Sequence, residues 1–323
     1  MDPRARTVFL QAPGRLRSGW RLAIYLVLLT AAISAFYAIL LAAGVVHHHH
    51  PDHAVAANPI RRLPDILAVV AAVLLVSTAL LWATDRRTLS TMGLALRWRA
   101  IPGALVGLLA GALPVAASAA ILAALGVATV RVSAPPAALL APAALAALLM
   151  TAAASALEEL LWRGYAFQLL IEGAGRWIAV LVTAVLWGLG HADNPGANAF
   201  GVVYILLSGV LLAWVVIRTG SLWFAIGYHI AWNVTAAHLF GLVTSGFDLG
   251  PAILRTTLAG PAWLAGGGFG FEASVVTELL DLLGLSTALV LSSRLPRLTE
   301  ALPFFERRAV PAALPLAVEP PRE

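Results

Sequence analysis

Long apolar runs, separated by short polar segments, dominate this chain. Eight runs reach the roughly 17–25 residues that an α-helix needs to cross a bilayer, and their Ala- and Leu-rich composition disfavours strands. We therefore expect an all-α fold, a polytopic membrane helix bundle of about eight transmembrane helices with no strands. The predicted helices cover residues 20–44, 63–83, 101–126, 139–172, 176–195, 200–218, 221–241 and 273–293.

The composition also indicates a membrane protein. The 323 residues are 60% hydrophobic and 11% charged, with a mean hydropathy of +0.88, whereas soluble domains are about 45–50% apolar and about 25% charged. The chain has no cysteine, which excludes disulfides, thiolate zinc sites and a cysteine nucleophile. Any chemistry must therefore use carboxylates, imidazoles, amides or hydroxyls.

The arginines predict the membrane topology. All 21 basic residues are arginine, and they lie at the ends of apolar runs rather than on one face, so we expect no nucleic-acid partner. With a cytoplasmic N-terminus, sixteen arginines fall inside and only Arg61, Arg62, Arg131 and Arg255 fall outside. This asymmetry predicts both termini in the cytoplasm. We expect an integral, multi-pass protein of the cell (plasma) membrane.

Three short polar motifs interrupt the apolar runs. A charge at the centre of a membrane helix costs about 2.5–3.5 kcal/mol on insertion scales, so ionisable residues there are usually functional. The motifs bring together acids, bases and an amide, which predicts a catalytic site inside the membrane. They are Glu158, Glu159 and Arg163; Trp187 and His191; and His229 and Asn233.

The positions of the first two motifs predict that they meet. Suppose that the fourth helix continues to Glu172 and that the following glycines turn the chain back into the fifth helix. Glu158 and His191 then each lie ~21–22 Å from this turn, on two neighbouring antiparallel helices. This hairpin predicts a site at mid-depth that opens toward the cytoplasm. In the alternative, the fourth helix ends at Arg163 and His191 lies near the external surface, away from the glutamates.

Helical spacing suggests roles within the motifs. Glu159 and Arg163 are separated by four residues, so they can form an ion pair along one helix face. Glu158 is turned about 100° away from Glu159 and is freer to act as a general base. His229 and Asn233 share one face of a later helix by the same four-residue spacing.

At these residues the chain resembles the CPBP family of intramembrane proteases, which includes CAAX prenyl endopeptidases and bacteriocin-processing or self-immunity proteins. The family pattern is Glu-Glu-x-x-x-Arg, Phe-x-x-x-His and His-x-x-x-Asn, each on its own helix. The second motif departs from it, since a tryptophan replaces the phenylalanine. The corresponding segments are Glu158-Glu159-Leu-Leu-Trp-Arg163, Trp187-Gly-Leu-Gly-His191 and His229-Ile-Ala-Trp-Asn233.

The resemblance implies an intramembrane endopeptidase that hydrolyses a peptide bond in a membrane-associated peptide or protein. By this resemblance, Glu158 and His191 activate a water molecule, while His229 and Asn233 hold the oxyanion; a carboxylate base with imidazole and amide donors suits that chemistry. The supporting residues would be Glu159, Arg163 and Trp187.

A divalent metal such as zinc is one of two options for this site. A carboxylate and two imidazoles match some catalytic zinc sites, so Glu158, His191 and His229 are the candidate ligands. The compact His-Glu-x-x-His of helical zinc proteases is absent from the sequence. A metal-independent glutamate mechanism is the equal alternative.

The resemblance divides the chain into three segments. Residues 1–126 hold the first three helices, residues 139–293 form a CPBP-like catalytic helical core, and residues 294–323 form a Pro-rich cytoplasmic tail that we expect to be disordered. The expected partners are the membrane lipid bilayer and the peptide or protein substrate. The sequence does not set the oligomeric state.

Two other functions stay open. A non-catalytic membrane partner or bacteriocin self-immunity protein could use the same frame, and a transporter could use the buried carboxylates for proton coupling. The three motifs together favour the enzyme, and the lack of paired repeat halves disfavours the transporter. Outside the motifs, the histidines at 47–50 and His53 predict an adventitious or pH-responsive loop, and His238 predicts a helix interface.

Overall fold

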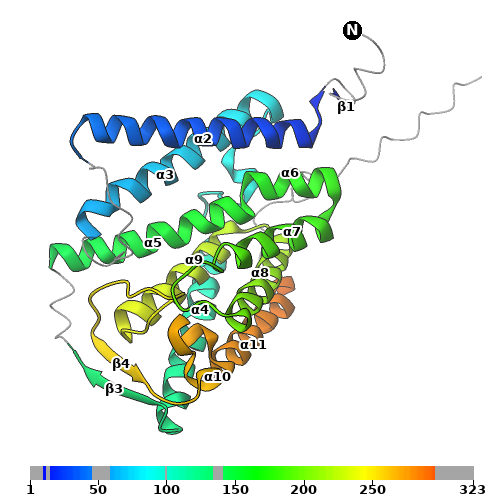
Figure 1. The fold of residues 1–323 in the computed structure, drawn as a ribbon. Helices are drawn as coiled ribbons and strands as arrows, with labels where there is room; N and C mark the ends of the chain where they lie inside the picture. The colour runs from blue at the N-terminus through cyan, green and yellow to red at the C-terminus, as the bar shows by residue number, and fades with distance from the viewer. Residues whose placement is uncertain (1–9, 12–14, 46–58, 99, 134–140, 295–323) are drawn as a thin grey trace, which may run out of the picture.

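The computed structural model describes residues 10–11, 15–45, 59–98, 100–133 and 141–294, and these form a mostly helical bundle (Figure 1). The longer helices are α2 (Ser18–Ala42), α3 (Pro59–Leu80), α4 (Ala100–Ala124), α5 (Pro142–Arg163), α6 (Tyr165–Ala174), α7 (Arg176–Leu189), α8 (Ala199–Thr219), α9 (Leu222–Val234) and α11 (Val275–Leu291). The shorter elements are the π-helical turns η2 (Leu81–Asp85) and η5 (Thr235–Leu239), the 3-10 turns η3 (Leu89–Met92), η6 (Gly267–Phe269), η7 (Phe271–Ala273) and η8 (Ser292–Arg294), and α10 (Ala262–Ala265).

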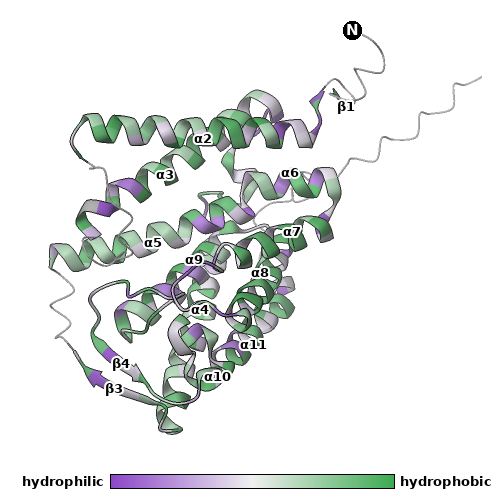
Figure 2. Cartoon of the chain, in the orientation of Figure 1, coloured by the Kyte–Doolittle hydropathy of each residue, from purple (hydrophilic) through white to green (hydrophobic). Residues whose placement is uncertain are grey.

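Within the described residues, five helical segments are long and apolar enough to cross a membrane. Apolar residues predominate along these helices (Figure 2), and many of their large side chains are exposed, such as Val27, which is 68% exposed. The chain is thus a multi-pass membrane protein, and the predicted membrane helix bundle is confirmed. The predicted count of eight spans is not confirmed, because α7, α9 and α11 have only 14, 13 and 17 residues. The five segments are Ser18–Ala42, Arg62–Asp85, Ala100–Ala124, Pro142–Ala174 and Ala199–Thr219.

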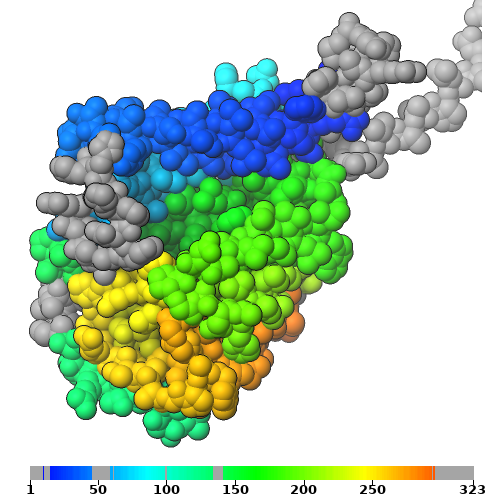
Figure 3. All heavy atoms as spheres, in the orientation of Figure 1, coloured from blue at the N-terminus to red at the C-terminus, as the bar shows by residue number. Residues whose placement is uncertain are grey.

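The helices that carry the polar motifs pack together in the middle of the bundle. α5 contacts α9 and α3, α7 runs beside α8, and α4 lies along α9. α2 covers α3 and α6 on one side of the bundle (Figure 1). The surface is hollowed between α2 and the α7–α8 region, where α5 is seen at depth (Figure 3).

The contact between α4 and α9 depends on a row of glycines. Gly103, Gly107 and Gly111 recur every fourth residue on α4. A Cβ atom at Gly107 would lie 2.2 Å from the carbonyl oxygen of Phe224, and one at Gly111 would lie 2.1 Å from that of Tyr228. Small residues at this spacing let membrane helices approach to backbone contact, so the row sets the position of α9 and the third motif.

Two helices differ from the predicted bounds. The predicted helix at 139–172 breaks at Gly164, where a Cβ would lie 2.0 Å from the carbonyl oxygen of Leu160; α5 ends there and α6 follows directly. The expected hairpin still forms, because Gly175 turns the chain from α6 into α7 with a φ of +91°. The predicted helix at 176–195 ends at Leu189, so His191 lies in the turn that follows.

The expectation of no strands is wrong. β3 (Ala128–Val132) pairs with β4 (Leu254–Leu258) in an antiparallel sheet, and β1 (Leu10–Gln11) pairs with β2 (Arg15–Leu16). β3 and β4 are rich in Thr and Val, whose branched side chains suit a pleated surface. The expected histidine loop at 47–53 and the expected tail from 295 onward lie outside the described residues.

Candidate active site

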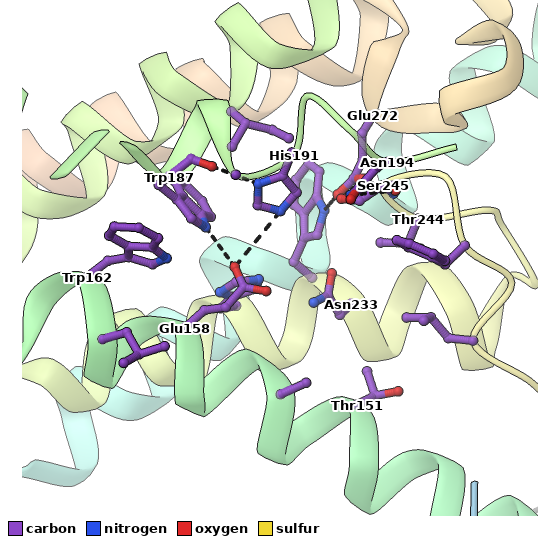
Figure 4. Close-up of a pocket in the computed structure, with 18 of the residues that line it drawn as sticks. Thr151, Glu158, Trp162, Trp187, His191, Asn194, Asn233, Thr244, Ser245 and Glu272 are labelled. Atoms are coloured by element: carbon purple, nitrogen blue, oxygen red, sulfur yellow. Dashed lines mark hydrogen bonds and ion pairs between the residues drawn. The ribbon is translucent and has the colours of Figure 1, made fainter. Parts of the chain in front are cut away.

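A cavity of about 660 Å³ lies among α3, α5, α7, α8 and α9 (Figure 4). All four residues predicted to be catalytic border it, namely Glu158, His191, His229 and Asn233, together with the supporting Trp187. Three separate stretches of sequence thus contribute to one concave site. A mainly apolar pocket with a few convergent polar groups is typical of a binding or active site.

Glu158 points from α5 toward the last turn of α7. Its Oε2 accepts a hydrogen bond from Trp187 Nε1 at 2.7 Å and lies 4.0 Å from His191 Nε2 (Figure 4). The Glu158 side chain is 33% exposed, so the cavity reaches the carboxylate. The tryptophan that departs from the family pattern therefore contributes a donor that phenylalanine lacks.

The backbone sets the tautomer of His191. Its Nδ1 lies 2.8 Å from the carbonyl oxygen of Trp187, and because a carbonyl only accepts, Nδ1 donates. In the neutral ring, Nε2 then carries the lone pair. Glu158 Oε2 and His191 Nε2 are two acceptors that face one another across 4.0 Å, an arrangement that one water molecule satisfies by donating to both.

Glu159 lies in different surroundings from its neighbour. Its Oε1 accepts hydrogen bonds from Arg163 NH1 at 3.0 Å and from His229 Nδ1 at 2.9 Å. Glu159 is fully buried and Arg163 is 1% exposed. The Arg163 guanidinium also lies 4.3 Å from the centroid of the Trp187 ring. The predicted ion pair is present, and it additionally holds His229, leaving Nε2 as the available ring nitrogen.

Asn233 is held by a short chain of hydrogen bonds to α5. Its Nδ2 donates to Ser155 Oγ at 2.9 Å, and Ser155 in turn donates to the carbonyl oxygen of Thr151 at 2.8 Å. One N–H of the amide is therefore used for positioning and the other stays available. His238, predicted at an interface, lies 2.9 Å from the Thr151 hydroxyl through its Nε2.

The metal-binding role predicted for Glu158, His191 and His229 stays a prediction. No three His, Asp or Glu side chains in the described part of the chain are arranged to hold one ion. His229 donates its Nδ1–H to Glu159, and His191 and Glu158 stand 4.0 Å apart.

Sequence reasoning missed two acids near the cavity. Glu272 borders it and accepts hydrogen bonds from Trp232 Nε1 at 2.7 Å and from the Ser245 hydroxyl at 2.7 Å. Asp281 is fully buried beneath it and accepts from Tyr228 OH at 2.7 Å. Both are carboxylates in apolar surroundings, the same signal that identified the first motif.

The direction of the cavity differs from the expectation. Its loop residues come from the segment after α7 and from the loop after η5, both of which the arginine distribution places outside; they are Gly190, His191, Asn194, Thr244, Ser245, Phe247 and Leu249. No described residue from the loops at the opposite end lines it. Because α7 ends before His191, the site lies near this end of the bundle rather than opening toward the predicted cytoplasmic face.

Comparison with family models gives a match to part of the chain. Residues 139–235 match the family model described as Rce1-like, type II CAAX prenyl endopeptidase. The matched block contains all three motifs. Neither the curated proteins nor the solved structures contain a significant match to the chain.

Proposed function

We propose that the chain is an intramembrane endopeptidase that uses a water activated by Glu158 and His191, in keeping with the match of residues 139–235 to a CAAX-type protease family model. One observation carries the proposal. The two acceptors face each other across 4.0 Å at the edge of a cavity, so a shared water would donate a hydrogen to each and keep its own lone pairs for attack.

The reaction follows from this arrangement. The water oxygen bonds to the scissile carbonyl carbon, and its proton passes to Glu158, a general base of the usual type. The tetrahedral intermediate then expels the amine, which takes the proton from Glu158 as the C–N bond breaks. Trp187 orients the carboxylate through its 2.7 Å hydrogen bond, and His191 holds the second hydrogen of the water.

The oxyanion is stabilised from α9. The free N–H of Asn233 and the Nε2 of His229 are the donors on that side of the cavity. Because His229 donates Nδ1–H to Glu159, Nε2 must also be protonated to donate, and the resulting imidazolium is stabilised by the Glu159 carboxylate. Donors fixed in advance in a water-poor site are worth about 10²–10³ in rate each.

The lining of the cavity points to a substrate with an apolar segment beside the scissile bond. Aliphatic and aromatic side chains from α3 and α5 face it, and burial of such surface contributes roughly 25 cal/mol per Å². We propose a membrane-associated peptide or protein as the substrate. The apolar side chains that line the cavity from α3 and α5 are Ile66, Val69, Met150, Leu161 and Trp162.

The test is cleavage of a fluorogenic peptide library by the purified full chain in detergent, with and without chelator. We expect Glu158→Gln to lower kcat by about 10²–10⁴, the usual contribution of a general base, and wild-type activity to persist in chelator. Asp193→Asn is the matched control, because Asp193 is an exposed acid two residues from His191.

Three outcomes would contradict the proposal. Full activity of Glu158→Gln would exclude its role as base. Loss of activity in chelator with recovery on added zinc would replace the mechanism by a metal-dependent one. Absence of cleavage by well-folded wild type across the library would favour a non-catalytic membrane partner.

A further inference from the structure

Two arginines lie side by side on the β3–β4 sheet, outside the candidate active site. Arg131 of β3 is directly opposite Arg255 of β4 in the antiparallel register. Residues paired in this way have Cβ atoms about 4.5–5.5 Å apart on the same face of the sheet. Both side chains are exposed, so the sheet presents two adjacent positive charges.

Nothing in the described part of the chain compensates these charges. Neither guanidinium has an ion pair or a side-chain hydrogen bond with a described residue. Like charges directly opposite one another destabilise a strand pair, so the arrangement favours a bound anion. The same face carries two further exposed hydroxyl groups. They belong to Thr129 and Thr257.

The sheet is fixed at the edge of the membrane-spanning region. β3 starts only four residues after Ala124, the last residue of a membrane-spanning helix. Part of the opposite face packs on the bundle, where Thr256 Oγ1 donates to the carbonyl oxygen of Phe240 at 2.7 Å. Figure 1 shows the sheet at one margin of the bundle. Lipid headgroups occupy this zone, just outside the roughly 30 Å hydrocarbon core.

We propose that Arg131 and Arg255 form a binding site for the phosphate of an anionic phospholipid in the adjacent leaflet. Guanidinium groups pair with phosphate oxygens through two parallel hydrogen bonds, and Arg favours phosphate for this reason. An anionic lipid suits the pair better than a zwitterionic one, because the headgroup cation of a zwitterion is repelled by the second arginine.

The test uses the full chain, purified in a neutral detergent and stripped of lipid. Native mass spectrometry counts retained phosphatidylglycerol, and thermal unfolding measures the shift in Tm on adding it. We expect phosphatidylglycerol to raise the Tm of wild type, and Arg131→Gln or Arg255→Gln to weaken lipid binding at least fivefold. Arg97→Gln, which removes a single exposed arginine elsewhere, should bind as wild type.

A lipid site also predicts that the difference in Tm between Arg131→Gln and wild type changes sign when lipid is added, which loss of folding would not produce. Without phospholipid, Arg131→Gln should unfold at or above the wild-type Tm, because the repulsion is gone; with phosphatidylglycerol, wild type should become the more stable. Equal lipid retention by wild type and Arg131→Gln would overturn the proposal. If inorganic phosphate raised the wild-type Tm as much as phosphatidylglycerol does, the arginines would form a site for free anions instead. If diacylglycerol raised it as much, the site would bind acyl chains.

Discussion

At the scale of single residues, two adjacent glutamates have opposite surroundings. Glu158 is one-third exposed and accepts a hydrogen bond from the neutral Trp187. Glu159 is fully buried and bound by Arg163 and His229. Helical geometry separates the two side chains by about 100°, so one faces the cavity and the other faces the neighbouring helices.

This difference predicts separate effects of two alanine substitutions. Glu159→Ala leaves Arg163 buried without its counterion, and removing one partner of a buried pair costs about 3–5 kcal/mol. Glu158→Ala should abolish cleavage and leave the unfolding midpoint close to wild type. Denaturation in mixed micelles, beside the cleavage assay, checks both. Equal loss of stability in the two variants would contradict the distinction.

The indole of Trp187 gives a second prediction. Trp187→Phe keeps an aromatic ring under Arg163 and removes the donor to Glu158, so the carboxylate loses its fixed orientation. A misplaced catalytic group can cost about 10²-fold, and we expect kcat to fall by about 10–10² with KM little changed. Trp162→Phe is the control, because Trp162 also lines the cavity. Equal rates in wild type and Trp187→Phe would exclude the positioning role.

The sequence identifies the candidate residues better than it identifies their partners. Ionisable residues in apolar runs are visible directly, and the four-residue spacing predicted the Glu159–Arg163 pair. The bonds of Trp187 to Glu158 and of His229 to Glu159 join residues 29 and 70 positions apart. These bonds depend on how α5, α7 and α9 pack against one another, and the apolar periodicity of a single helix carries no information on that packing.

At the scale of elements, the α4–α9 contact positions the oxyanion side of the site. Gly111→Ala should lower stability by about 1–3 kcal/mol, the usual cost of overpacking, because the new Cβ would meet the carbonyl oxygen of Tyr228. Shifting α9 should also lower kcat. Gly19→Ala is the control, since a Cβ there meets no atom within 4 Å. Unchanged unfolding of Gly111→Ala would contradict the tight contact.

Element bounds were predictable where apolar length decided them. Most of the long helices begin and end within a few residues of the predicted apolar runs, because the length of an apolar run sets the length of the helix that crosses the bilayer. The break at Gly164 agrees with the alternative helix end at Arg163, but the apolar pattern did not favour that end, because the pattern continues through the break and the break depends on backbone packing. β3 and β4 were missed because pairing of two short segments more than 120 residues apart leaves no local signal beyond their Thr and Val content.

At the scale of the whole molecule, a second buried ionic network joins the N-terminal helix to the core. Arg21 donates to Asp85 and to Glu172, each at 2.5 Å, and Arg15 donates to the same two acids at 2.7 and 3.0 Å. Tyr165 OH donates to Asp85 at 2.8 Å. Two cations thus balance two carboxylates where α2, η2 and α6 meet.

Removing Arg21 should loosen this junction. Arg21→Met leaves Asp85 and Glu172 with Arg15 as their one remaining cation, and we expect a loss of about 3–5 kcal/mol in the free energy of unfolding, typical of a broken buried pair. Arg17→Gln is the control, because Arg17 is exposed and only one turn away. Unfolding in mixed micelles measures both. Indistinguishable stabilities would show that the network does not hold α2 to the core.

The most direct test of the central claim is a double-mutant cycle on peptide cleavage, with Glu158→Gln, His191→Ala and the double variant. If one water is shared by the two side chains, either substitution removes its activation, so the double variant should be about as slow as each single one, as for residues that act as a unit. Losses that multiply in the double variant, or full activity of either single variant, would contradict a shared water.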